Sequence, residues 1–103
     1  MRQTNRRTTV LAKIKEPIFA CTSIHGHKDC RHADQEKTKQ LSGLIVEVSL
    51  QACGHYRCDR EMLFRAIESR DGTDSPLYKY WKSLLHIGRH AYFPPKEVEI
   101  VQD

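Results

Sequence analysis

Apolar residues alternate with polar ones in several short segments of this chain, and this period of two predicts β-strands. The clearest case is segment 44–50, where every second residue from Leu44 is apolar and shares one strand face. Segment 8–14 is β-branched and partly alternating, and segment 18–21 is short and apolar, so each predicts a further strand. Segment 97–101 alternates again after two prolines, which predicts a closing strand on the sheet edge.

In the C-terminal half the period changes to that of an α-helix, twice. Asp59 is placed to cap the first helix and Gly72 to end it. The apolar stripe of this helix is Met62, Leu63, Ala66 and Ile67. Ser75 and Pro76 are typical of a helix start, and Gly88 is a plausible end for this second helix. Its buried stripe is Leu77, Trp81, Leu84 and Leu85.

These elements predict a single domain of the α+β class. We expect a small, mostly antiparallel sheet of about three or four strands, followed by a C-terminal two-helix unit. Residues 8–103 form this domain, with a short helix within 33–39, whereas residues 1–7 are expected to be a disordered basic arm. A chain of 103 residues buries only a modest core, so a bound metal would be a useful supplement.

One short motif occurs twice, 28 residues apart. Gly26-His27-Lys28-Asp29-Cys30 returns as Gly54-His55-Tyr56-Arg57-Cys58, so each copy has the pattern Gly-His-x-x-Cys. Two imidazoles and two thiols are the ligand set of a tetrahedral structural zinc. The sequence therefore predicts one Zn2+ bound by His27, Cys30, His55 and Cys58, which would tie the two halves of the domain together.

The choice of ligands stays open at this stage. The alternates near the two copies are Cys21, His25, His32 and Cys53. In the alternatives to a metal site, the cysteines are small buried residues, or they form two disulfide bonds. Buried reduced cysteines would contribute to core packing, whereas disulfide bonds require an oxidising compartment.

Enzymatic activity is not expected. A catalytic zinc needs an open coordination position and a nearby carboxylate, for which Asp29 and Asp59 are the candidates, so a metal-dependent nuclease remains a minor alternative. No deaminase, zinc-protease, phosphate-loop or hydrolase motif occurs in the chain. His86 and His90 are four residues apart on the expected last helix, where positive charge is favourable near the C-terminus.

Positive charge is concentrated in two segments of a chain whose net charge is +4. The first is the arm with Arg2, Arg6 and Arg7, and the second is the polar face of the last helix, with Lys79, Lys82, His86 and Arg89. Such segments favour binding to phosphates or to an acidic protein surface, although a solvated helix face has the same pattern.

The functional prediction is a small zinc-binding regulatory protein that binds nucleic acid through the basic arm and the basic helix face. The alternative is a protein-interaction module or inhibitor, of the kind found in viruses or plasmids, that docks on a larger nucleic-acid-handling protein. No apolar run reaches membrane-spanning length and the N-terminus has no apolar signal region, so we expect no membrane partner and an intracellular location, in the cytoplasm or the nucleoid or nucleus. The target, its sequence preference and the oligomeric state do not follow from the sequence.

Overall fold

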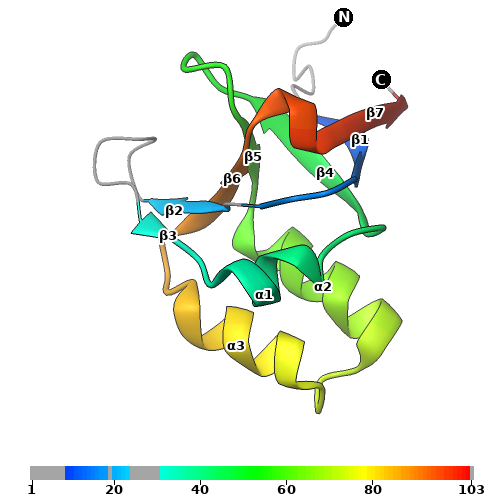
Figure 1. Cartoon of the computed structure of the whole chain (residues 1–103), viewed down its shortest axis with the longest axis vertical. Helices are drawn as coiled ribbons and strands as arrows, with labels where there is room; N and C mark the ends of the chain where they lie inside the picture. The colour runs from blue at the N-terminus through cyan, green and yellow to red at the C-terminus, as the bar shows by residue number, and fades with distance from the viewer. Residues whose placement is uncertain (1–8, 19, 24–30, 103) are drawn as a thin grey trace, which may run out of the picture.

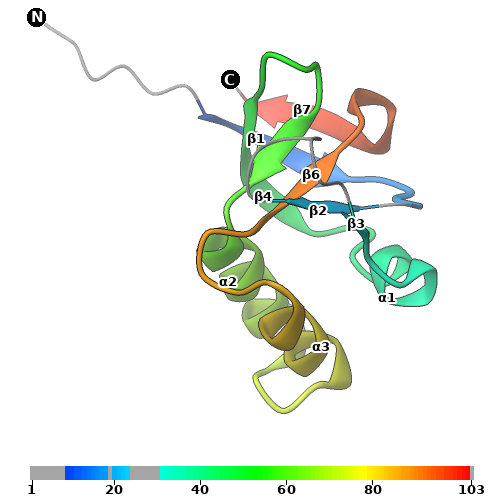
Figure 2. The same cartoon turned by 90° about the vertical axis from the view of Figure 1, so that its left-hand side faces the viewer.

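A computed structural model describes residues 9–18, 20–23 and 31–102 of the chain. Within them the elements follow in this order: β1 (Thr9–Ile14), β2 (Cys21–Ser23), β3 (Arg31–His32), α1 (Gln35–Lys39), β4 (Ile45–Leu50), β5 (Tyr56–Cys58), α2 (Arg60–Asp71), α3 (Pro76–Leu84), β6 (His90–Phe93), the 3-10 helix η1 (Pro95–Glu97) and β7 (Val98–Gln102). The protein is thus a mixed α+β structure, and all three α-helices lie on one side of a curled sheet (Figures 1 and 2).

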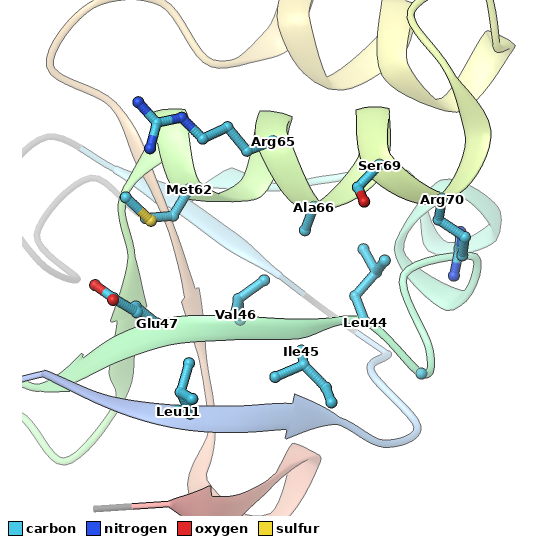
Figure 3. Close-up of a pocket in the computed structure, with 11 residues that line it drawn as sticks. Leu11, Leu44, Ile45, Val46, Glu47, Met62, Arg65, Ala66, Ser69 and Arg70 are labelled. Atoms are coloured by element: carbon cyan, nitrogen blue, oxygen red, sulfur yellow. The ribbon is translucent and has the colours of Figure 1, made fainter.

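The described strands form one seven-stranded sheet in the order β3-β2-β6-β5-β4-β1-β7, and all neighbours are antiparallel. The pairing of β1 with β4 is the longest ladder, and β7 closes the sheet as an edge strand, as predicted. In contrast, β5 is short, and its pairing with β4 is limited to Ser49 and Leu50 at the end of that strand. The first half of β4 therefore has a strand on one side only, and helix α2 lies along its other side (Figure 3).

The core lies between the sheet and the helices. Its largest fully buried side chains include Trp81 and Leu85 near the C-terminal end of α3, Leu63 and Ile67 on α2, and Phe93 on β6. The indole Nε1 of Trp81 also donates a hydrogen bond to the carbonyl oxygen of Lys37, 3.4 Å away, which links α3 to α1. Burial of large apolar side chains from several elements is the main stabilising term for a domain of this size.

Local signals in the sequence set the helix starts. Ser75 caps α3 by accepting a hydrogen bond from the Tyr78 N–H at 3.1 Å, and Pro76 occupies the first turn. Gly72, with φ of 87°, ends α2 in a backbone conformation that favours glycine. The end of the second helix was predicted wrongly: α3 stops at Leu84, so Gly88 lies in a later turn.

The sheet has seven described strands and not the three or four predicted, and no metal-binding group ties the described strands together. Strands β3, β5 and β6 were not predicted because segments of two to four residues are too short to show a period. The predicted strand at 18–21 begins only at Cys21. Leu50, which shares its strand face with the buried residues Val46 and Val48, is 60% exposed, and a turn follows directly after it.

Candidate functional site

The second copy of the Gly-His-x-x-Cys motif is a hairpin that leads into a strand, not a metal-binding knuckle. Gly54, with φ of 96°, forms the turn between β4 and β5, and the chain is then extended through Tyr56–Cys58. In an extended chain, residues three positions apart lie roughly 10 Å apart and point to opposite faces. His55 and Cys58 therefore do not chelate one ion together.

Cys58 is a core residue. Its side chain is completely buried within the hydrophobic core, and its Sγ lies 3.7 Å from the carbonyl oxygen of Asp59, to which the thiol donates a hydrogen bond. Burial raises the pKa of the Cys58 thiol far above its usual range, and the negative charges of Asp59 and Glu47 raise it further. Cys58 therefore contributes packing to the core.

The other predicted ligands that the structure describes are not brought together. Cys21 is disulfide-bonded, whereas Cys53 is an exposed free thiol in the β4–β5 turn. Among residues 9–18, 20–23 and 31–102, no group of three or more histidine, cysteine, aspartate or glutamate residues is arranged to hold a metal ion. His25, His27 and Cys30 lie outside the described residues, and for His32 only the backbone, paired with Cys21 in the sheet, is described.

His90 belongs to β6 and not to a helix shared with His86. Its Nδ1 accepts a hydrogen bond from the backbone N–H of Arg60 at 3.1 Å, which satisfies one of the free N–H groups at the start of α2. Asp59 occupies the cap position but its side chain makes no cap hydrogen bond; its Oδ1 lies 3.0 Å from Nε of Arg57 and 3.8 Å from Nδ1 of His90. Burial lowers the pKa of His90, which keeps the imidazole neutral as an acceptor.

Two of the four predicted basic residues share the outward face of α3. Lys79 and Lys82 are both exposed, and neither forms an ion pair with any residue in the described part of the chain. His86 is exposed but follows the end of the helix. Arg89 is half-buried, and its guanidinium donates to the carbonyl oxygen of Thr22 at 3.4 Å. The predicted arm residues Arg2, Arg6 and Arg7 lie outside the described residues.

Aromatic residues hold the cations at the α2–α3 junction. The ammonium of Lys82 lies 5.2 Å from the ring centroid of Phe64 and 5.6 Å from that of Tyr78. From α2, the guanidinium of Arg60 lies 5.0 Å from the same Phe64 ring. The Phe64 and Tyr78 rings are therefore occupied by cations of this protein, as a cation–π arrangement would favour, and they are not free platforms for stacking bases.

A groove that the sequence did not predict runs between α2 and β4. Its volume is about 520 Å³, and its apolar lining residues are Leu11, Leu44, Ile45, Val46, Met62 and Ala66. In Figure 3, Ala66 and Ser69 point from α2 toward β4, while Leu44 and Val46 point from β4 toward the helix. The groove exists because β5 does not extend beside the first half of β4, and because the facing helix residues Ala66 and Ser69 are too small to fill the space.

Three charged residues, Glu47, Arg65 and Arg70, line this α2–β4 groove, and the two arginines differ in their interactions. Arg70 donates to the carbonyl oxygens of Gln40 at 2.7 Å and Ser42 at 3.1 Å, and it pairs with Asp71 at 2.9 Å. The hydrogen bonds that the Arg70 guanidinium donates to the Asp71 carboxylate lower the pKa of that carboxyl group. Arg65 is exposed and forms no ion pair with a described residue. Arg65 is thus available to an external anion, whereas Arg70 is a structural clamp.

Comparisons with known proteins give no identity: no family model, no curated protein and no solved structure matches this chain. In the described residues, no helix has the length and apolar character needed to cross a bilayer. The described part of the molecule presents two candidate binding surfaces, the exposed face of α3 and the α2–β4 groove.

Proposed function

We propose that this protein is a small nucleic-acid-binding regulator whose outward α3 face contacts the phosphate backbone. The observation that carries this proposal is the pair Lys79 and Lys82, exposed on a helix that contains no acidic residue and engaged in no ion pair with a described residue. Phosphate oxygens are the natural partners of such lysines, and their neutralisation releases counterions from the nucleic acid.

The cation–π contacts of Lys82 support the proposal. A lysine side chain normally loses considerable rotamer freedom when it binds a phosphate. The rings of Phe64 and Tyr78 already restrict Lys82 before any partner arrives. Arg60 lies against the same Phe64 ring but pairs with Glu61 at 3.2 Å and donates to the carbonyl oxygen of Leu85, so the positive surface rests on the two lysines of α3.

Nucleic-acid binding of this kind is dominated by phosphate contacts. The Phe64 and Tyr78 rings are covered by cations, and Tyr80 accepts a hydrogen bond from the Asp34 N–H at 2.8 Å through its hydroxyl oxygen. These interactions disfavour base stacking as the source of affinity. We therefore expect weak sequence preference and strong dependence on salt.

The test is fluorescence anisotropy with labelled single- and double-stranded DNA and RNA over a series of salt concentrations. Replacing Lys79 and Lys82 together by glutamine should lower the affinity at low salt about tenfold or more, and reduce the slope of log affinity against log salt by about two. The matched control replaces Lys39 and Lys96, which are exposed on other elements, and removes the same charge.

The control variant should keep most of the wild-type affinity, and both variants should keep the wild-type melting temperature, since exposed lysines contribute little to stability. Equal losses in the two variants would show that only net charge matters, and would remove α3 as the binding face. Absence of binding by the wild-type protein to all four nucleic acids at low salt would overturn the proposal.

A further inference from the structure

We propose that the α2–β4 groove is a docking site for a short protein segment that presents apolar side chains together with an acidic residue. This interaction goes beyond the nucleic-acid binding proposed for α3 and uses another part of the molecule. The groove is lined by α2 residues 62, 65, 66 and 69, whereas the α3-facing side of α2 carries Phe64 beneath Lys82. The protein would therefore hold two partners on two sides of one helix.

The groove leaves apolar surface uncovered. Ile45, which lines the groove from the β1 side of β4 (Figure 3), is 54% exposed. Met62 and Ala66 are only half-buried, even though they continue the apolar stripe of α2. Covering these side chains with apolar atoms of a partner would gain hydrophobic free energy that the isolated protein does not realise.

The hollow surface beside β4 is elongated. A smaller hollow of about 110 Å³ shares Glu47 and Met62 with the groove and continues to Thr9 and Ser49. The two hollows together follow the length of β4. An extended chain segment, with side chains in successive depressions, fits such a surface better than a compact small molecule, for which polar groups converge in a closed pocket.

The groove also carries a positive charge that is available to a partner. Arg65 lies at the rim above Met62 (Figure 3), is exposed, and forms no ion pair within the described residues. Arg70, at the other end, is already bound to Asp71 and to two backbone carbonyl groups. The cation that remains available therefore selects a carboxylate in the partner, placed beside its apolar side chains.

The mode of docking is through side chains. The ladder to β1 occupies one edge of β4, and α2 covers the approach to the other edge. Specificity would then come from one or two apolar anchors that fill the space between β4 and the residues Ala66 and Ser69 of α2, together with one ion pair to Arg65.

The experiment selects binders from a display library of random linear peptides against the folded wild-type protein. Selected peptides are synthesised, and their affinities are measured by isothermal titration calorimetry for wild type and three variants. Arg65→Glu reverses the available charge, Ala66→Trp fills the groove, and the Lys79→Gln, Lys82→Gln double variant leaves the groove intact. Circular dichroism and melting curves check that each variant is folded.

We expect enrichment of peptides that combine leucine, isoleucine or phenylalanine with aspartate or glutamate. Their affinity should fall about tenfold or more in Arg65→Glu and in Ala66→Trp, and stay unchanged in the double lysine variant. If Ala66→Trp does not fold, Ser69→Trp and the exposed Arg65→Glu variant provide the same discrimination.

Several results would overturn the proposal. These are the failure to enrich any peptide, the enrichment of basic peptides, and binding that is equal in wild type and the groove variants. Size-exclusion chromatography with light scattering adds a further outcome: concentration-dependent dimers that Arg65→Glu dissociates would show that the occupant is a second copy of this chain. If Arg65→Glu and Ala66→Trp abolish nucleic-acid binding and the double lysine variant does not, the occupant of the groove is nucleic acid and not a protein segment.

Discussion

Two sides of helix α2 lie in different environments: one is packed into the core, and the other faces a hollow. The sealed side, formed by Leu63, Phe64 and Ile67, is buried against the sheet and α3, with two of these side chains completely inaccessible. The groove side, formed by Met62, Arg65, Ala66 and Ser69, faces a hollow beside β4. Residues of the two sides follow one another along the same helix, and Met62 on the groove side is about as apolar as Leu63 on the sealed side. Hydrophobicity alone therefore does not decide whether a side chain supports the fold or is available for binding.

This contrast follows from what lies opposite each side. Opposite the sealed side are Trp81 of α3, Leu85 just after α3 and Phe93 of β6, which are large enough to fill the space. Opposite the groove side, β5 ends too early to contribute a strand, and Leu44 and Val46 leave a hollow beside the small residues Ala66 and Ser69. Close packing in the first region and an unfilled hollow in the second imply that mutations on the two sides should affect different properties.

The largest expected effect is on the sealed side. Leu63→Ala should lower the free energy of unfolding by about 2–5 kcal/mol, because the lost side chain leaves a cavity in a tightly packed core. Met62→Ala, one residue away on the groove side, should cost only about 1 kcal/mol or less, since its side chain is already half-exposed. Urea unfolding followed by circular dichroism measures both values. Similar costs for the two variants would show that the two sides do not differ in packing.

An effect of intermediate size is expected at Cys58, which is buried in the same core immediately before α2. Cys58→Ser introduces a hydroxyl group at a position with no exposure and should cost about 1–3 kcal/mol. Cys53→Ser, in the exposed turn of the same hairpin, should change stability by less than about 0.5 kcal/mol.

The two thiols should also differ in reactivity. A thiol reagent should label Cys53 in the native protein, and Cys58 only after unfolding, because its protonated thiol is neither accessible nor nucleophilic. Rapid labelling of Cys58 in the native protein, identified by mass spectrometry of peptides, would show that this side of the core is open.

The smallest effect is a pH dependence at the N-terminal end of α2. Because burial lowers the pKa of His90 in the folded protein, unfolding is accompanied by proton uptake once the pH falls below about 6.5, the usual value for histidine. Stability should therefore be unaffected by this group above about pH 6.5 and should fall as the pH decreases toward the folded-state pKa. Asp59 and Glu61 oppose this shift, and Arg57 and Arg60 add to it.

His90→Asn isolates this contribution, since the amide oxygen can accept the Arg60 N–H hydrogen bond without titrating. The melting temperature of wild type should fall more than that of His90→Asn between about pH 7.5 and pH 5.5. Parallel curves for the two proteins would mean that the α2 N-terminus is insensitive to the charge of His90.

Local signals in the sequence determined several elements of this protein. Ser75 and Pro76 start α3, Gly72 ends α2, and the alternation in 44–50 corresponds to β4. These features depend on hydrogen bonds and backbone preferences within a few residues, so the chain carries them without reference to the rest of the fold. The closing strand at the edge of the sheet could also be predicted, because two prolines separate it from the preceding segment.

Only the tertiary structure decided what each of these elements contacts. The repeated Gly-His-x-x-Cys pattern suggested a second ligand pair, but the pairing of β5 with β4 and β6 buries Cys58 in the core. The same apolar stripe predicted for α2 is divided between a filled core and an open groove by the short length of β5. Burial, thiol chemistry and groove formation depend on residues distant in sequence, and a local pattern contains no information about which of them will lie opposite.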